Sequence, residues 1–173
     1  MANTPHVQIR LLAATDAARY RDIRLEGLEQ NPEAFGSTFG QENGKPLSWF
    51  EERIAQTDIF GAFVEDELLG VAGYLTEEGP KHRHKGILWG MFVRAIARNS
   101  GLAKRLVADV IGHASEQVEQ VKLSVVSENQ AARRLYASHG FVEYGREIRA
   151  LNQEGRYYDE LLMVKVLGPD PEN

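Results

Sequence analysis

The chain has 173 residues, 43% of them hydrophobic, with 16 Gly, 6 Pro and no Cys. This length and composition are typical of one globular domain and exclude disordered, collagen-like and repeat proteins, so we expect a domain at 1–168 and a frayed tail at 169–173. The absence of cysteine excludes disulfides, thiolate metal sites and a cysteine nucleophile. The longest apolar stretch, 86–93, is too short to span a membrane, and residues 1–10 show no secretory signal. We therefore expect a cytoplasmic protein that binds no membrane.

The net charge of −5 argues against nucleic-acid binding, but the charge is unevenly distributed. Residues 79–108 contain no carboxylate and seven basic side chains: Lys81, Arg83, Lys85, Arg94, Arg98, Lys104 and Arg105. That segment carries +7, which leaves −12 on the rest of the chain. A local cationic stretch in an acidic protein favours a small anionic ligand over a polyanion, although chance clustering on a solvated face would give the same pattern.

Hydrophobic periodicity predicts the elements in the first half of the chain. Thr15 or Asp16 can cap the first helix, and Ser48 with Glu51 matches a capping box over a short helix. The dense Gly and Ser of 33–45 favour a long loop. In chain order, we expect a strand at 7–12, a helix at 16–30, that loop, a helix from 48, and antiparallel strands at 59–64 and 68–76.

The second half of the chain predicts a strand–helix–strand crossover followed by a hairpin. The stretch 86–93 is apolar on both faces, as in a central strand, and a crossover from it to the next strand makes the two strands parallel. Asn129 can cap the second helix of this half, and Gly140 follows that helix. The expected elements are strands at 86–93 and 121–126, helices from 101 and at 129–138, and paired strands at 141–150 and 157–166.

A turn of small residues, Arg98-Asn99-Ser100-Gly101, joins the central strand to the long helix. The first turn of a helix presents unpaired N–H groups with partial positive charge, which makes an anion site. Gly101 lets a ligand approach the backbone closely, and Lys104 adds a full charge nearby. The turn matches neither a Walker loop nor the GxGxxG fingerprint, so alone it indicates either a pyrophosphate site or an ordinary tight turn.

A second pattern follows the next strand: Asn129-x-x-Ala132-x-x-Leu135-Tyr136-x-x-x-Gly140-Phe141. Both helix N-termini should lie at the sheet edge where ligands of parallel strands bind. Together the two patterns resemble the GNAT superfamily of acyl-CoA-dependent N-acetyltransferases, whose [Q/R]-x-x-G-x-[G/A] fingerprint fits residues 98–103, and the order of elements agrees along nearly the whole chain. The resemblance implies an α/β fold with a mostly antiparallel central sheet, one parallel strand pair splayed into a V-shaped cofactor wedge, and helices on both faces.

The resemblance also implies that acetyl-CoA enters this wedge as co-substrate. Its pantetheine would pair with the backbone of the central strand, and its pyrophosphate would rest on the N–H groups that open the long helix. Asn129 would help to hold the pantetheine arm, and Tyr136 would place its hydroxyl beside the thioester sulfur. The residues expected to bind acetyl-CoA are Met91, Phe92, Val93, Arg98, Asn99, Ser100, Gly101, Leu102, Ala103, Lys104, Asn129, Ala132 and Tyr136.

The implied reaction is direct attack of a neutral primary amine on the thioester, without a metal. Tyr136 fits as the acid that protonates the leaving thiolate, because a phenol is protonated at neutral pH, although it also fits a core position. The candidates for the base are Glu33, Glu77, Glu78, His84 and Asp159. Glu77 is the first choice, because it ends a strand near the centre of the predicted sheet. The expected acceptor walls are Phe35, Trp89, Tyr157 and Asp159, although Trp89 also fits the core.

Two other functions remain compatible with the sequence. One is a non-catalytic acyl-CoA-binding sensor or partner domain, and the other is a nucleotide-binding α/β domain. Tyr136 favours the enzyme, because a pure binder would not need a phenol at that position. The acceptor is expected to be a small-molecule or peptide amine, and a homodimer is a possible assembly because relatives are commonly dimers.

Overall fold

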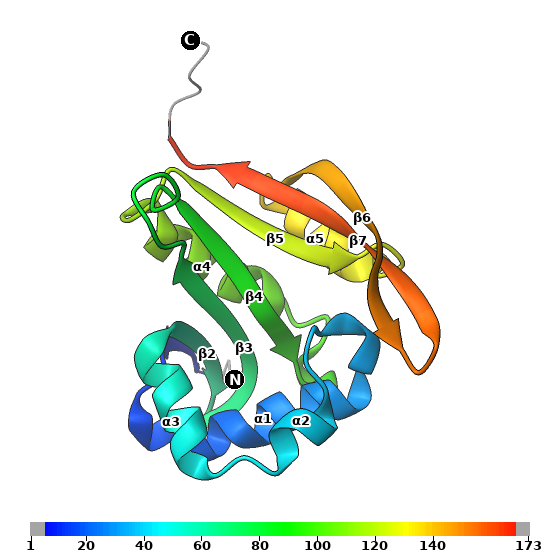
Figure 1. The fold of residues 1–173 in the computed structure, drawn as a ribbon. Coiled ribbons are helices and arrows are strands. Elements are labelled where there is room, and N and C mark those ends of the chain that lie inside the picture. Colours follow the sequence, from blue (N-terminus) through cyan, green and yellow to red (C-terminus); the bar gives the residue numbers. More distant parts are fainter. Residues whose placement is uncertain (1–5, 169–173) are drawn as a thin grey trace.

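Seven strands form one sheet in the order β1-β2-β3-β4-β5-β7-β6. The computed structural model of the protein describes residues 6–168, and the tail expected at 169–173 lies outside them. The strands are β1 (Val7–Leu11), β2 (Asp58–Val64), β3 (Glu67–Thr76), β4 (Lys85–Val93), β5 (Gln120–Val126), β6 (Val142–Gln153) and β7 (Arg156–Val166) (Figure 1).

The helices of residues 6–168 are α1 (Ala17–Gln30), α2 (Phe39–Asn43), α3 (Leu47–Gln56), α4 (Leu102–Ser115) and α5 (Gln130–Ser138). Short 3₁₀ turns occur at Ala14–Asp16, Pro32–Ala34 and Ala95–Ala97. Within the described part of the chain, no helix is both long and apolar enough to cross a membrane.

The central strands β4 and β5 are parallel and separate after a short paired stretch. Their registered pairs run only from Lys85 with Gln120 to Ile87 with Lys122, and Figure 1 shows the two strands diverging beyond it. The other neighbouring pairs of the sheet are antiparallel. The expected mixed sheet with one splayed parallel pair is therefore confirmed.

A β-bulge in β4 lies where the two strands separate. Gly73 pairs with Trp89 and Val71 with Phe92, which leaves two residues of β4 opposite one residue of β3. One of these two is Gly90, with φ of +62°, a left-handed conformation that glycine adopts without a Cβ clash. A bulge bends the strand that carries it, and this bend accounts for the turn of β4 away from β5.

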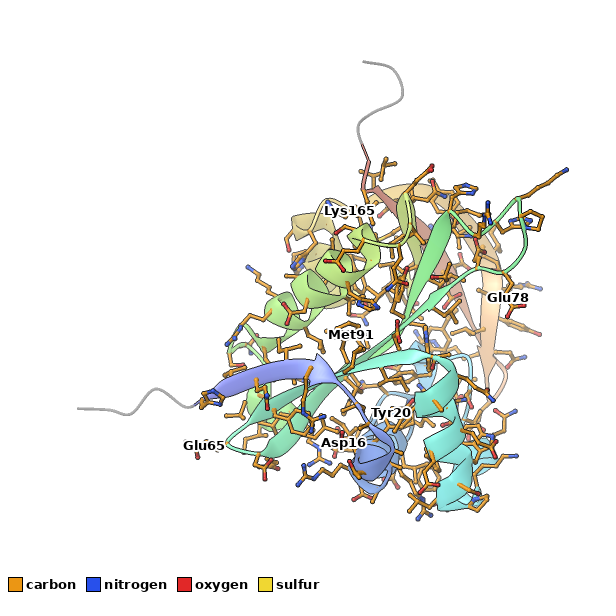
Figure 2. The ribbon with its side chains drawn as sticks, turned by 90° about the vertical axis from the view of Figure 1, so that its left-hand side faces the viewer. Asp16, Tyr20, Glu65, Glu78, Met91 and Lys165 are labelled. Atoms are coloured by element: carbon orange, nitrogen blue, oxygen red, sulfur yellow. The ribbon has the colours of Figure 1, made fainter. Side chains whose placement is uncertain are left out.

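Helices cover both faces of the sheet, as expected. On one face α4 packs Leu106 and Val107, neither of which is exposed, into a core with β2–β5 and β7. On the other face, α1 and α3 contribute Tyr20 and Phe50 to a second core with β2, β3 and β4. Figure 2 shows Met91 of β4 near the middle of the molecule. The strand that diverges at the bulge is thus held between two packed layers.

The prediction of a long loop at 33–45 is wrong, because this segment contains α2. The N–H group of Gln41 donates to Thr38 Oγ1 at 3.2 Å, and the Thr38 N–H donates to the Gln41 side chain at 3.0 Å. These reciprocal bonds form a capping box, which satisfies N–H groups at the start of the helix. The Gly and Ser content of the segment favoured a loop, although the Thr-x-x-Gln pattern is typical of a helix start.

The side chains expected to cap α1 and α3 do not bond the N–H groups of these helices. The helix α3 begins one residue before Ser48, with Pro46 at its N-cap and no side-chain cap. Asp16 is the N-cap residue of α1, as expected, but its carboxylate accepts no N–H group of that helix. Instead it accepts the Ala13 N–H at 2.9 Å and pairs with Arg10 at 2.7 Å. Sequence spacing alone does not show which local partner the Asp16 carboxylate or the Ser48 hydroxyl takes.

Candidate active site

A cleft of about 590 Å³ lies where β4 and β5 diverge. Its walls come from the last residues of β4, the turn before α4, the first turns of α4 and α5, and the segment after α1. The lining residues are Asn31, Ala34, Phe35, Met91, Phe92, Val93, Ala97, Arg98, Asn99, Gly101, Ala103, Lys104, Asn129, Ala131, Ala132 and Leu135. Both sequence patterns therefore contribute to one cleft.

The N-terminal end of α4 forms one wall of this cleft. Gly101 is the N-cap with φ of +83°, and a Cβ built on it would meet no atom within 4 Å, so the space above the turn is open. Asn99 also has a left-handed φ, +62°. The first N–H groups of a helix have no carbonyl in a preceding turn and carry the positive end of its dipole. This wall fits a diphosphate group.

Two residues of the same turn do not line the cleft. Ser100 Oγ donates to the Ala97 carbonyl at 2.6 Å, so its hydroxyl stabilises the turn itself. Leu102 is 3% exposed and packs in the core beneath α4. These two residues can therefore bind a ligand only through their backbone groups.

Arg98 and Asn129 lie on the walls of the cleft and are held there by the protein. Arg98 Nε donates to the Val93 carbonyl at 3.2 Å, and its guanidinium lies 5.8 Å from the centre of the Phe92 ring. Asn129 caps α5 as expected, because its Oδ1 accepts the Ala132 N–H at 3.1 Å. The side-chain N–H₂ group of Asn129 takes no part in this cap and can donate to another group.

Tyr136 lies in α5 one turn after Ala132, and it is not among the residues that line the cleft, although its neighbour Leu135 is. Its side chain is 7% exposed, and its ring meets the Phe141 ring edge-on at 5.9 Å. Burial raises the pKa of the Tyr136 phenol well above its usual range. The hydroxyl is therefore a protonated donor at any neutral pH.

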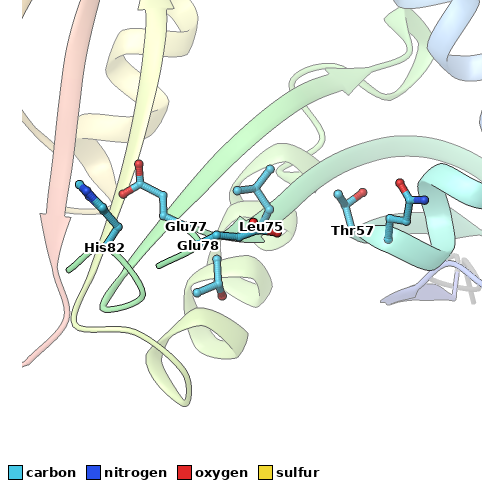
Figure 3. Close-up of a pocket in the computed structure, with 7 residues that line it drawn as sticks. Thr57, Leu75, Glu77, Glu78 and His82 are labelled. Carbon is cyan, nitrogen blue, oxygen red and sulfur yellow. The ribbon is translucent and has the colours of Figure 1, made fainter. Parts of the chain in front are cut away.

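Glu77 is not brought to this cleft. It lines a different cavity of about 810 Å³ with Glu78 and His82, shown in Figure 3. Its N–H donates to the carbonyl of Lys85, the first residue of β4, so about seven residues of extended strand, roughly 23 Å, separate it from Phe92. The cavity at Glu77 and the cleft therefore lie at opposite ends of β4.

The Glu77 carboxylate is held by two ammonium groups. Lys122 lies at 3.0 Å and Lys85 at 3.2 Å from its oxygens. Desolvation acts to raise the pKa of Glu77, but these two ion pairs outweigh it and leave the pKa below its usual value. A carboxylate with a lowered pKa is a weaker proton acceptor, so its surroundings do not favour the predicted role as base.

The four expected acceptor-wall residues separate into two pairs. Phe35 lines the cleft, and with Trp89 it lines a second cavity described below. Tyr157 is 51% exposed on the β6–β7 hairpin. Asp159 accepts the Arg149 N–H at 2.8 Å and pairs with Arg146 at 2.7 Å, which lowers the pKa of Asp159. Tyr157 and Asp159 line neither cavity and belong to the hairpin's own structure.

A second cavity of about 330 Å³ adjoins the cleft and shares Ala34 and Phe35 with it. It lies between the first part of β4, the segment before α2, and the strands β5 and β7. Its lining residues are Arg24, Ala34, Phe35, Gly36, Ser37, Arg53, Ile87, Leu88, Trp89, Gly90, Ser124 and Glu160. The bulge of β4 stands between the two cavities, since Gly90 lines one and Met91 the other.

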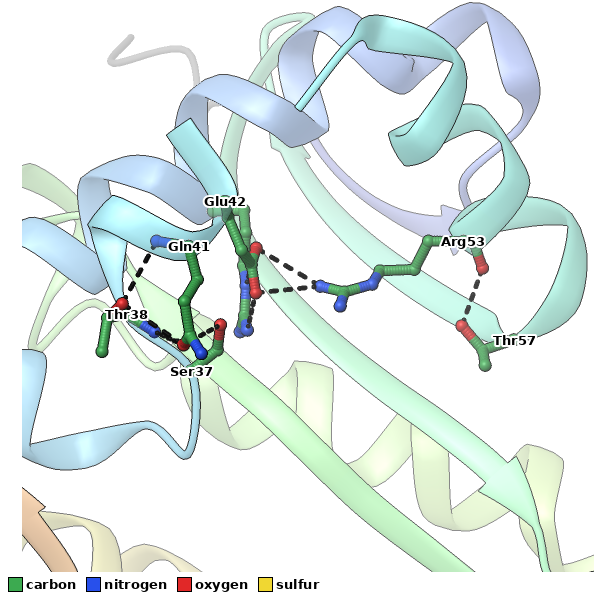
Figure 4. Close-up of polar contacts among 7 residues, drawn as sticks. Ser37, Thr38, Gln41, Glu42, Arg53 and Thr57 are labelled. Carbon is green, nitrogen blue, oxygen red and sulfur yellow. Dashed lines mark hydrogen bonds and ion pairs between the residues drawn. The ribbon is translucent and has the colours of Figure 1, made fainter. Parts of the chain in front are cut away.

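One wall of the second cavity is a buried charge cluster. Arg24, 7% exposed, donates through Nε and Nη2 to the two carboxylate oxygens of Glu42 at 3.0 and 2.8 Å, and Glu42 is 2% exposed. Arg53 approaches the same carboxylate at 3.3 Å (Figure 4). Desolvation acts to raise the pKa of Glu42, but the Arg24 bonds outweigh it and lower the pKa. The cluster is therefore ionised and holds two positive charges against one negative charge.

Glu160 of β7 lies on another wall of this cavity. Its side chain is partly buried, and it pairs across the sheet with Glu147 of β6. Desolvation raises the pKa of Glu160, the neighbouring Glu147 raises it further, and a hydrogen bond with Ser124 only partly opposes them. A carboxylate with a raised pKa is a better proton acceptor near neutral pH.

Sequence reasoning missed Arg24, Glu42 and Glu160. Arg24 carried a signal, because it lies four residues after Tyr20 and among the apolar residues of α1, and a charge on a buried stripe needs a partner. Glu42 lies in α2, within the segment that the sequence predicts as a loop. Glu160 lies one position after Asp159, and only the register of β7 shows which of the two carboxylates faces the cavity.

A family model described as the acetyltransferase (GNAT) family matches residues 23–141. The chain is similar, at 26% identity, to an acetyltransferase of the GNAT family from Streptococcus pneumoniae, with a TM-score of 0.83 over 94% of this chain and 100% of that one. It is also 26% identical to a ribosomal-protein-alanine N-acetyltransferase from Brucella melitensis, with a TM-score of 0.80 over 92% and 99% of the two chains.

The fold is also shared with yncA from Salmonella typhimurium, solved with its cofactor acetyl-CoA, at 20% identity and a TM-score of 0.79 over 96% of this chain and 99% of that one. Among curated proteins, none matches the sequence. The family match covers both sequence patterns and the strands between which the cleft opens, and the family uses acetyl-CoA. The chain therefore belongs to the GNAT family of acetyltransferases.

Proposed function

We propose that this protein transfers the acetyl group of acetyl-CoA to a primary amine by direct attack within a ternary complex. The observation that carries the proposal is the cleft between the diverging strands β4 and β5, which gathers residues of both family patterns on its walls. A ternary mechanism fits a chain that has no cysteine and in which a second cavity adjoins the cleft.

In this proposal the chain holds acetyl-CoA along the cleft. The N–H groups from Asn99 to Lys104 and the guanidinium of Arg98 bind the diphosphate. The backbone of β4 from Met91 to Val93 pairs with the pantetheine, beside Asn129. The bound thioester supplies an activated acetyl group, and N–H groups of β4 near the bulge polarise its carbonyl.

Two proton transfers remain for the protein. An alkyl ammonium with a pKa of about 10.4 is only about 0.04% neutral at pH 7, so the site must lower that pKa or supply a base. The leaving thiolate needs a proton, and Tyr136 is proposed to donate it, because its raised pKa keeps the phenol protonated. Ala132 and Leu135 of the same helix line the cleft, so this role requires the Tyr136 hydroxyl to reach the thiolate from α5.

The alternative is a non-catalytic acyl-CoA-binding domain. Against it stands the second cavity, which shares Ala34 and Phe35 with the cleft and contains ionisable groups. A module that only senses acyl-CoA would not need a charged cavity next to the thioester position.

Calorimetry and product release together test the proposed function. Acetyl-CoA should bind, whereas ATP and NAD should not, and free CoA should appear when amines are added. Because the chain has no cysteine, a thiol reagent reports released CoA without background from the protein. Binding without release across all amines would favour the non-catalytic domain, and binding of ATP or NAD instead of acetyl-CoA would contradict both.

We also propose that the protein can form a homodimer through the open face of β5, β7 and β6. Figure 1 shows α5 behind these strands. Val142 and Val166 are 61% and 54% exposed, and strand alternation puts them on the face opposite the buried Leu161 and Met163. Sedimentation velocity should show a dimer that Val142→Glu dissociates. A monomer at all concentrations would contradict this assembly.

A further inference from the structure

We propose that the second cavity binds an acceptor that carries a carboxylate as well as its amine, with the carboxylate on Arg24 and the amine beside Glu160, which accepts its proton. This inference rests on the proposed acetyl transfer and adds the chemical class of its acceptor. Its evidence is the arrangement of charges around the cavity.

The anion subsite is the free edge of a buried guanidinium. Arg24 uses Nε and Nη2 for Glu42, which leaves Nη1 with no hydrogen bond to any residue of 6–168. Nη1 faces the bulge of β4, because a Cβ built on Gly90 would lie 3.6 Å from it. A guanidinium has five donors and binds carboxylates in preference to neutral groups. An acceptor carboxylate there would accept a hydrogen bond from Nη1 of Arg24.

The charge of the cluster calls for one more anion. Arg24 is buried, whereas Arg53 is 23% exposed and partly solvated, and both face the single carboxylate of Glu42. Buried charges in proteins are normally paired, so the missing anion concerns Arg24 first. The net positive charge lies on a cavity wall rather than in closed core, since both arginines line the cavity. A ligand carboxylate would balance this charge without disturbing the Arg24–Glu42 pair.

The amine would bind at the negatively charged wall of the same cavity. Glu160 and the hydroxyl of Ser124 line it together, whereas Glu147 of β6 lies across the sheet from Glu160. The remaining charged groups around the cavity are those of the arginine cluster on α1, α2 and α3. An ammonium beside Glu160 and a carboxylate on Arg24 would therefore match the field of the cavity at both ends.

The cavity also limits the size and character of the acceptor. Its volume of about 330 Å³ suits a small molecule, and Phe35, Ile87 and Trp89 give it apolar surface. The guanidinium of Arg24 lies 5.2 Å from the centre of the Phe35 ring, which fixes its orientation. These features fit an amino acid with an apolar side chain.

In the reaction, the acceptor nitrogen attacks the thioester carbonyl carbon, so that a C–N bond forms and the C–S bond breaks. The acceptor ammonium first gives one proton to the Glu160 carboxylate, which passes it to water, and the neutral nitrogen then attacks. After attack the nitrogen gives Glu160 a second proton, and the CoA sulfur leaves as a thiolate that takes one proton from Tyr136, so that one proton is released per turnover. Both residues regain their original states by exchange with water, and no oxidant, reductant or metal takes part. Glu160 thus supplies the base that Glu77, held by two lysines, does not.

A matched set of acceptors tests the class directly. Leucine, phenylalanine and methionine are each compared with the corresponding amide and decarboxylated amine, and CoA release is measured. The free acids should have a kcat/KM at least about tenfold above both analogues, as one charge-assisted hydrogen bond allows. The α-amine of an amide loses its proton easily, with a pKa of about 8, so amine basicity alone would favour the amides.

Two variants assign the two ends of the acceptor. Arg24→Lys retains a charge for Glu42 but has no second edge for a ligand, and it should raise KM for the acids about tenfold while affinity for acetyl-CoA and KM for the amides stay constant. Glu160→Gln should lower kcat about 100-fold and remove the acidic limb of the pH–rate profile. In the matched control Glu147→Gln, that limb should move to lower pH while the alkaline plateau stays unchanged.

The outcomes separate this inference from the proposed function. Turnover of amides or decarboxylated amines at the rate of the acids would overturn the inference and leave acetyl transfer intact, and so would an unchanged KM in Arg24→Lys. Acetyl-CoA binding without turnover of any of the nine probes would also overturn the inference. Failure of the protein to bind acetyl-CoA would instead overturn the proposed function.

Discussion

Replacement of Gly101 with valine is expected to weaken acetyl-CoA binding by at least about 100-fold, as loss of two charge-assisted hydrogen bonds would. Gly101 opens α4 with φ of +83°, and the space above it is free of protein atoms within 4 Å. A valine side chain would project into that space, where the proposal places the diphosphate, and it would push the first N–H groups of α4 away from the ligand. Calorimetry with acetyl-CoA measures the effect.

The control for this variant is Gly155→Val. Gly155 lies in the turn between β6 and β7 with φ of +88°, and it too has no neighbour within 4 Å. Both variants carry the same kind of backbone strain, about 1–3 kcal/mol, which a domain of ordinary stability tolerates. Gly155→Val should bind acetyl-CoA normally. Equal losses in both variants would mean that strain, and not the occupied cleft, weakens binding.

Replacement of Tyr136 with phenylalanine is expected to lower kcat by about 100-fold or more if this phenol donates the proton to the leaving thiolate. The ring packs against Phe141, and phenylalanine preserves this contact. Affinity for acetyl-CoA should therefore change little. Steady-state CoA release, together with calorimetry, separates the two quantities.

Tyr74→Phe provides the matched loss of a hydroxyl. Tyr74 belongs to the same core cluster and is 1% exposed, and its hydroxyl lies 3.4 Å from Thr76 Oγ1 rather than near the cleft. This variant should retain full turnover. A Tyr136→Phe enzyme that is as fast as Tyr74→Phe would remove Tyr136 from the mechanism.

The elements of the fold could be predicted where hydrophobic periodicity and local caps agree. The apolar spacing after Gly101 predicted α4, and Asn129 predicted the start of α5, because each signal lies within a few residues of the element it fixes. The prediction failed where a local signal was outweighed by composition, as with Thr38 and α2. The strand β6 runs to Gln153 and β7 begins at Arg156, so the turn between them is shorter than the expected strand ends, 150 and 157, imply.

The wall of the cleft formed by the start of α4 could be predicted from the sequence, whereas the second cavity could not. The turn at 98–101 and the start of α4 are contiguous, so their geometry follows from local structure. The second cavity instead brings together Arg24, Trp89 and Glu160 from three distant segments. Its position depends on the bulge at Gly90 and on strand register, and neither is encoded in a short pattern. The sequence likewise does not show that Glu77 lies at the end of β4 opposite the cleft, because the pairing of β3 with β4 sets that distance.

A crystal structure of the protein with desulfo-CoA would test the central claim, namely that the opening amides of α4 bind the diphosphate. The account predicts the two phosphates within hydrogen-bonding distance of N–H groups between Asn99 and Lys104, with the pantetheine running along β4. A complex in which only solvent occupies that corner while the compound lies elsewhere would contradict it.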